Sequence, residues 1–90
     1  MTYIITVSGR KMDFKNPDPD QVFIGDIATA LSRAPRFAGH TVAPWDVAAH
    51  STFVSLHCDP QFAFAGLMHD AAEAYMADLP SPLKALCPEY

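Results

Sequence analysis

Positive charge is scarce in this sequence of 90 residues, and the scarcity narrows the range of possible partners. Six residues are Lys or Arg and ten are Asp or Glu, which gives a net charge of −4 and an isoelectric point near 5.3. The basic residues are scattered along the chain rather than gathered in one stretch. Proteins that bind nucleic-acid backbones usually carry a clustered basic face, so we expect no nucleic-acid polymer as a partner.

Cysteines and long apolar runs are also rare. Cys58 and Cys87 lack the spacing of a zinc finger, and no signal peptide precedes them. We therefore expect reduced thiols in a cytoplasmic protein. No apolar run approaches the roughly 20 residues that cross a bilayer, so we expect no membrane partner.

Hydrophobic residues, in contrast, are abundant: they make up 50% of the chain, whereas charged residues make up only 18%. A chain of this length forms one small domain with a limited core. We expect a single domain over residues 1–90 whose apolar surface is covered in a homo-oligomer or by another protein. The alternative is that the chain is the front part of a larger domain.

The pattern of residues predicts a mainly α fold, a bundle with a short N-terminal β-hairpin. β-Branched and aromatic residues over 3–7 and a second short run over 11–14 flank a turn, which predicts the hairpin. Residues 1–23 are expected to form this hairpin and the loop after it. Residues 24–90 are expected to form the helical part, which we predict to be incomplete.

Helices are predicted from apolar periodicity and from Pro and Asp at their ends, over 25–33, 44–57, 61–76 and from residue 82 onward. The second opens with Pro44, and the third has Asp59 as its N-cap and Pro60 at its first position. The third helix is apolar almost all round, which predicts a central and buried position. Ala65 and Gly66 would let another helix approach it closely.

Ionisable residues in this apolar part of the chain are the strongest chemical signal. His50 lies upstream of an adjacent pair, His69 and Asp70, and Glu73 follows on the same side of the expected helix. Imidazole and carboxylate groups together suit a divalent metal ion. Residue types alone favour a simpler interpretation, in which the histidines are hydrogen-bonded core residues and Asp70 caps or pairs with another group.

Resemblance across nearly the whole chain reverses that preference. Segments that include Arg-Phe-Ala-Gly-His (36–40), His-Asp-Ala-Ala-Glu (69–73) and Asp-Leu-Pro-Ser-Pro-Leu-Lys (78–84) resemble the HD-domain phosphohydrolases. Further matching segments span 8–10, 14–17, 26–32 and 47–51. The chain is most similar to the small phage and bacterial type, which includes 5′-deoxynucleotidases and phage deoxynucleoside triphosphohydrolases. Proteins of this family are α-helical bundles around a metal ion.

The resemblance implies a role for each matching residue. The metal ligands would be His50, His69 and Asp70, holding a divalent Mn, Co, Fe, Zn or Mg ion. Glu73 would orient or deprotonate the attacking water. The substrate contacts would be Arg36, His40, Asp78 and Lys84. Two departures stand out: the usual Gly before the loop aspartate is Ala77, and the family's last aspartate ligand has no counterpart in this chain.

The function implied is metal-dependent hydrolysis of phosphate from a nucleotide, most simply a deoxynucleotide, in the cytoplasm, or in the host cytoplasm if the chain is phage-encoded. The alternative is a catalytically inactive, HD-derived protein-binding module, such as a phage-encoded inhibitor or regulator. Phe37 and Trp45 are candidates for stacking on a base, but core packing is the preferred prediction for both. His57 is predicted to be a partly exposed residue at a helix end, and Cys58 a packing residue.

Overall fold

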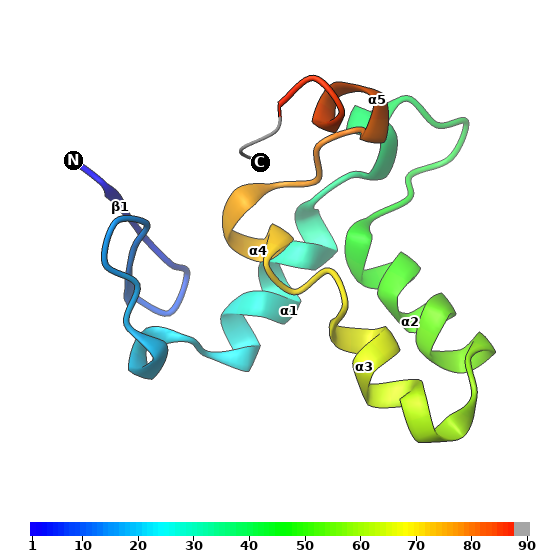
Figure 1. Ribbon diagram of the computed structural model, residues 1–90, viewed down its shortest axis with the longest axis horizontal. Coiled ribbons are helices and arrows are strands. Elements are labelled where there is room, and N and C mark those ends of the chain that lie inside the picture. The colour runs from blue at the N-terminus through cyan, green and yellow to red at the C-terminus, as the bar shows by residue number, and fades with distance from the viewer. Residues whose placement is uncertain (88–90) are drawn as a thin grey trace.

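The computed structural model describes residues 1–87, which are mainly α-helical with an antiparallel two-stranded hairpin at the N-terminus (Figure 1). In the hairpin, β1 (Tyr3–Ile5) pairs with β2 (Lys11–Asp13). Gly9 supplies the left-handed backbone of the turn at φ 89°, a conformation that glycine adopts without steric cost. The predictions of a mainly α fold and of an N-terminal hairpin are therefore confirmed.

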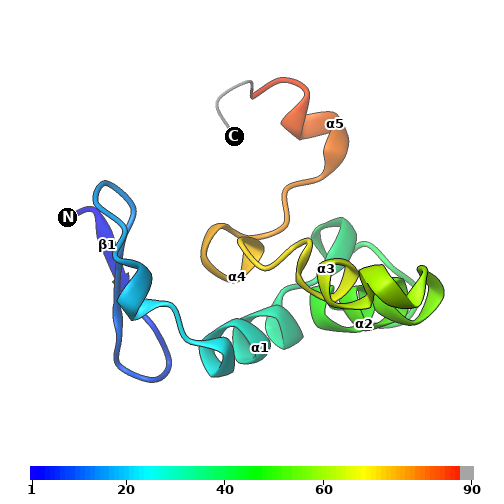
Figure 2. The ribbon, with the colours of Figure 1, turned by 60° about the horizontal axis from the view of Figure 1, so that its bottom comes forward.

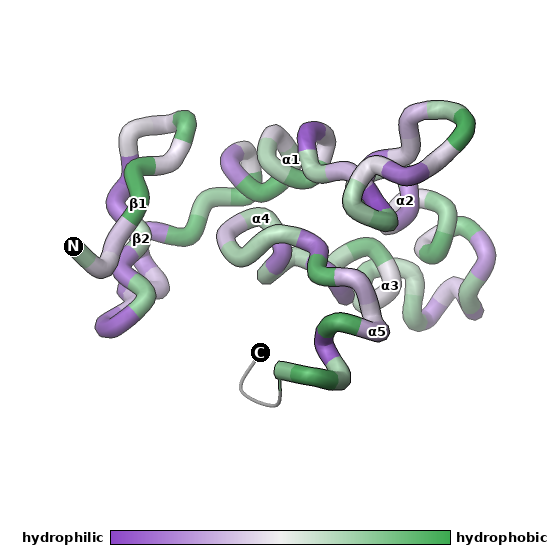
Figure 3. The backbone as a smooth tube through the Cα atoms, turned by 90° about the horizontal axis from the view of Figure 1, so that it is seen from above, coloured by the Kyte–Doolittle hydropathy of each residue, from purple (hydrophilic) through white to green (hydrophobic). Residues whose placement is uncertain are grey.

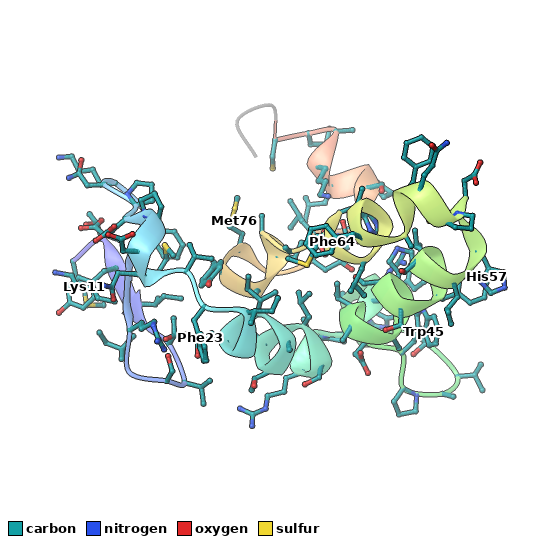
Figure 4. All side chains as sticks on the ribbon, turned by 90° about the horizontal axis from the view of Figure 1, so that it is seen from below. Lys11, Phe23, Trp45, His57, Phe64 and Met76 are labelled. Atoms are coloured by element: carbon teal, nitrogen blue, oxygen red, sulfur yellow. The ribbon has the colours of Figure 1, made fainter. Side chains whose placement is uncertain are left out.

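A buried carboxylate joins the hairpin to the first helix, α1 (Ile24–Arg33). Asp26 is only 3% exposed, and its carboxylate accepts hydrogen bonds from the hydroxyls of Thr6 and Ser8, both at 2.7 Å, and from the Ser8 amide at 3.0 Å. Burial alone would raise the pKa of Asp26, but these hydrogen bonds and the nearby Arg10 outweigh it and lower the pKa. The Arg10 guanidinium also lies 4.0 Å from the ring centre of Phe23, which Figure 4 labels between the hairpin and α1.

Asp26→Asn is expected to weaken this junction and to change how stability depends on pH. The folded-state pKa is below the ordinary value of 3.8, so the stabilisation is fully present above 3.8 and is lost as the pH falls through the folded-state value. The variant should have a lower Tm at neutral pH and a smaller further loss on acidification. Circular dichroism melts from pH 7 to pH 2 measure both effects. Asp20→Asn, an exposed change, is the control, and equal acid sensitivity of the Asp26 variant and the wild type would contradict the assignment.

The core lies where α1 meets the second helix, α2 (Val47–His57). Ile27 and Leu31 from α1 pack with Val47, and full burial of each such side chain contributes about 1.5–3 kcal/mol. Figure 3 shows hydrophilic and hydrophobic residues alternating along α1, as expected for a helix that covers a core with one face. The prediction that α2 begins at Pro44 is wrong. The Asp46 side chain accepts from the Ala49 amide at 2.8 Å, so it caps the helix and fixes the start at Val47.

The predicted continuous helix over 61–76 is also wrong, because it is broken into separate pieces. A short 3-10 helix (Pro60–Phe62) leads into α3 (Ala63–Met68), and a turn over 69–72 separates α3 from α4 (Glu73–Met76). The break has a packing reason, since α3 packs on α2 whereas α4 packs on α1, and one straight helix cannot follow both directions. Figures 1 and 2 both show α2 and α3 side by side.

The remaining predictions for the segment around α3 are confirmed in part. Pro60 does open the 3-10 helix, but the Asp59 side chain makes no capping hydrogen bond. Gly66 allows the close approach that was predicted, because a Cβ there would lie 3.1 Å from the Cys58 sulfur and 3.3 Å from a Val54 methyl. Burial all round is wrong, since large apolar side chains of this segment are exposed, namely Phe62, Phe64 and Leu67.

Shorter elements complete the described chain. A 3-10 helix (Pro19–Gln21) follows the hairpin, and a 3-10-type turn (Arg36–Gly39) with left-handed backbone at Phe37 and Ala38 follows α1. The last described helix is α5 (Ser81–Lys84), close to the predicted start at residue 82. None of the helices in residues 1–87 has the length and apolar character that a membrane crossing requires.

Candidate metal centre

Two elements distant in sequence bring three potential ligands together. His50 comes from α2, and His69 and Asp70 come from the turn that ends α3. One ligand atom from each residue lies within 4.8 Å of the other two. Asp70 Oδ2 is 2.9 Å from His69 Nε2 and 3.6 Å from His50 Nε2. Ligands of one zinc ion each lie about 2.0–2.2 Å from it, so a small inward movement would let all three share an ion.

The hydrogen bond on the far side of His69 determines which nitrogen faces this cluster. His69 Nδ1 lies 2.6 Å from the carbonyl oxygen of Gly66, which can only accept, so Nδ1 carries a proton and donates. In a neutral ring, Nε2 then presents a lone pair 2.9 Å from a carboxylate oxygen of Asp70. Two lone pairs at that distance repel each other unless a cation lies between them. This arrangement, with Nδ1 donating to a carbonyl, is also typical of metal-binding histidines.

The environment of His50 favours the form that binds metal. Burial and the positive charge of Arg36 lower the pKa of His50, while the carboxylate of Asp70 acts in the opposite direction. A histidine with a lowered pKa is neutral at physiological pH, and only a neutral imidazole can ligate a metal ion. The donor set therefore fits a divalent cation, with two imidazole nitrogens and one carboxylate oxygen.

A pocket of about 340 Å³ opens beside this cluster, and charged side chains of both signs line it. Arg36 Nε lies 3.8 Å from Asp78 Oδ2, and Lys84 Nζ lies 3.9 Å from Glu73 Oε1. The pocket also includes the three candidate ligands. The pocket is thus surrounded by residues from α2, α4 and α5, from the segment after α1, from the turn over 69–72 and from the loop after α4. Arg36 and Lys84 line it together with the three residues that would hold a metal ion.

Glu73 has the most perturbed carboxylate of the pocket. Burial, followed by the negative charges of Asp70 and Asp78, raises the pKa of Glu73 to about 7, although Lys84 acts to lower it. Its Oε2 atom is buried and has no hydrogen-bond partner among the described residues. A carboxyl group with a pKa near neutrality can both accept and return a proton, which suits a general base.

His40 does not join the pocket. Its side chain is exposed, and it is not among the residues that line the cavity. Ala77, at the position where the HD resemblance would imply Gly, has φ 68° and ψ 165°, a conformation found almost only in glycine. Asp78 follows directly and does line the pocket.

Sequence reasoning missed some residues of this pocket and placed others correctly. Phe37 was predicted to pack in the core, but it is exposed and lines the pocket, and Trp45 is likewise exposed. The sequence signal that could have placed Phe37 at the pocket was its position between Arg36, a candidate phosphate contact, and Gly39. His57 and Cys58 match their predictions: His57 is exposed, with Nδ1 2.8 Å from the Phe53 carbonyl, and the free Cys58 packs beside Gly66.

Comparison with known proteins adds relatives but no activity. No model of a known protein family matches the chain. The chain is 44% identical over 90 residues to the uncharacterized protein YfdR of Escherichia coli K12. This match covers 100% of the chain and 51% of that relative. It is 34% identical over 88 residues to the uncharacterized protein RCAP_rcc00048 of Rhodobacter capsulatus, with 88% of the chain and 45% of the relative covered. The chain thus spans about half the length of the curated relatives it matches.

Proposed function

We propose that this chain carries the metal site of an HD-type phosphohydrolase that removes phosphate from nucleotides, with deoxynucleotides as the first candidates. The observation that carries the proposal is the convergence of His50, His69 and Asp70, with His69 Nε2 facing a carboxylate oxygen of Asp70. The same pocket is also lined by the cationic side chains of Arg36 and Lys84. The pattern of these residues in the sequence resembles the HD family, which supports the same proposal. The free thiols support the cytoplasm as the place of the reaction.

Each side chain has a distinct part in this proposal. His50, His69 and Asp70 would hold a divalent ion, which supplies Lewis acidity to a phosphoryl group. Arg36 and Lys84 would bind phosphate oxygens and offset the charge that develops during transfer. Glu73 would accept a proton from the attacking water. Asp78 lies 3.8 Å from Arg36 and would hold its guanidinium in the pocket.

Two measurements on the purified protein test the proposal together. Elemental analysis should find a divalent transition metal close to one equivalent per chain, and phosphate release should be detected with a panel of deoxynucleoside mono- and triphosphates. Dialysis against a chelator should abolish the release, and adding back Mn²⁺, Co²⁺ or Zn²⁺ should restore it. A protein that binds none of the candidate metal ions at micromolar concentration would overturn the proposal.

A second candidate function, protein binding, is favoured by the apolar side chains exposed on α2 and α3. Leu56 is 76% exposed and Phe64 is 75% exposed, and exposed apolar surface of this kind marks interaction sites. We expect the isolated chain to self-associate through this surface as a two-fold dimer, the commonest closed arrangement.

Leu56→Glu and Phe64→Glu should therefore shift the protein from dimer to monomer in multi-angle light scattering. A charge buried at an interface without a partner strongly opposes association. Val42→Glu adds the same charge at an exposed loop position and should leave the dimer intact. A wild-type chain that is monomeric at millimolar concentration would contradict self-association.

A further inference from the structure

The turn after α1 has a backbone that is unusual for its residues. Phe37, Ala38 and Gly39 all have left-handed conformations, with φ values of 56°, 54° and 85°. Glycine adopts this region freely, but for phenylalanine and alanine it costs free energy. Backbone hydrogen bonds hold the turn, from His40 to the Phe37 carbonyl at 3.0 Å and from Arg36 to the Trp45 carbonyl at 2.8 Å. The surroundings therefore impose a conformation that the local sequence disfavours.

This turn places an aromatic ring at the pocket rather than in the core. Phe37 is 55% exposed and lines the same cavity as His50 and Asp70. The Arg36 guanidinium lies 4.8 Å from the centre of the Phe37 ring and also pairs with Asp78. The guanidinium that would bind a phosphate oxygen therefore lies over one face of the Phe37 ring, whose side chain is still more than half exposed.

A ligand that fills this pocket would meet two different chemistries. Arg36 and Lys84 offer positive charge to a phosphate, whereas Phe37 offers a flat, apolar and polarisable surface. Planar heterocycles stack well on such rings, whereas a bare sugar phosphate, which has no flat π-face, gains much less from them. The side chains of Leu79, Pro80 and Pro82 also line this pocket and add apolar wall.

We propose that Phe37 is a specificity-determining residue that stacks on the base of a nucleotide whose phosphate is bound at Arg36 and Lys84. This inference rests on the proposed function, since it places the substrate of the same site. It makes the pocket selective for phosphate esters that carry a nucleobase over those that carry only a sugar. The left-handed turn is what directs the ring to the pocket.

The test compares 2′-deoxyadenosine 5′-monophosphate with 2-deoxyribose 5-phosphate, which lacks the base. Phe37→Ala should raise the KM for the nucleotide by about 5- to 150-fold, the range that loss of one base–aromatic stack predicts. The KM for the sugar phosphate should change far less. Phe37→Trp should restore selectivity, because it keeps an aromatic face. Phe14→Ala is the matched control, since Phe14 is 50% exposed on the hairpin side of the molecule and is not part of the pocket lining.

Calorimetric binding of the same two ligands in the Glu73→Gln background, with Mn²⁺ present, separates this inference from the proposed hydrolysis. Base-dependent binding that falls on Phe37→Ala, combined with no phosphate release by the protein that retains Glu73, would support the stacking role and overturn the proposed function. Phosphate release with equal effects of Phe37→Ala on both ligands would overturn the stacking role and leave the function standing. Failure of both ligands to bind would overturn the stacking role. Thermal melts of each variant confirm that the compared proteins are folded.

Discussion

Asp70→Asn is expected to remove most of the bound divalent metal and to lower phosphate release by more than about 100-fold. Asp70 Oδ2 is the atom that both histidine nitrogens approach, at 2.9 Å and 3.6 Å, so it lies at the centre of the candidate ligand set. The amide of Asn keeps the size of the side chain but has no negative charge. Loss of residues that only support a metal ligand costs 10- to 100-fold in affinity or activity, so loss of a ligand itself should cost at least as much.

Metal content by mass spectrometry and phosphate release are measured on the same preparation. His69→Gln should behave like Asp70→Asn. Matched controls come from exposed residues of the same types, His57→Gln and Asp59→Asn, and both should retain metal and activity. Metal content that stays at the wild-type level in both site variants would show that the cluster is held by a protonated histidine rather than by a metal ion.

Glu73→Gln should separate metal binding from chemistry. Glu73 lines the pocket beside the ligand set, and its Oε2 atom is buried without a hydrogen-bond partner among the described residues. Its pKa of about 7 lets it exchange a proton with water near neutral pH. Loss of a positioned general base costs about 10²–10⁴-fold, so kcat should fall by that factor while metal content is retained.

The stopped-time phosphate assay and elemental analysis together measure this separation. Asp59→Asn again serves as the exposed control, and a thermal melt checks that Gln at position 73 is tolerated. Wild-type turnover in Glu73→Gln would remove Glu73 from the mechanism. Loss of metal together with activity would instead make Glu73 a ligand, a role that sequence reasoning did not give it.

Local signals in the sequence predicted the elements whose ends are determined by neighbouring residues. The β-branched run before Gly9 gave the hairpin, and Pro35 gave the end of α1, because these residues restrict φ and ψ wherever they occur. The break over 69–72 could not be predicted in this way. Apolar spacing is continuous through that stretch, and only the different packing partners of α3 and α4 separate the two helices.

The convergence of the three candidate ligands was predicted better than the helices that carry them. His50, His69 and Asp70 converge as predicted. The helix that was expected to place Glu73 beside them is broken, but after the turn over 69–72 Glu73 still lines the same pocket. His40 was predicted to contact the substrate, but it does not line the pocket. Phe37 was predicted to pack in the core, but it does line the pocket. A left-handed turn decides which of these side chains reaches the cavity, and no residue pattern indicates such a turn when its first two positions are not glycine.

The hydrogen bond between His69 Nδ1 and the Gly66 carbonyl would couple the last turn of α3 to the affinity of the proposed site for a metal ion. That carbonyl is one of those left without a partner inside the helix, so the imidazole closes the helix end while its other nitrogen faces the cluster. By thermodynamic reciprocity, an ion that immobilises the ring must strengthen the helix end, and fraying of the helix must weaken the hold on the ion. Amide hydrogen exchange in α3 should therefore report metal occupancy from a segment that contains no ligand.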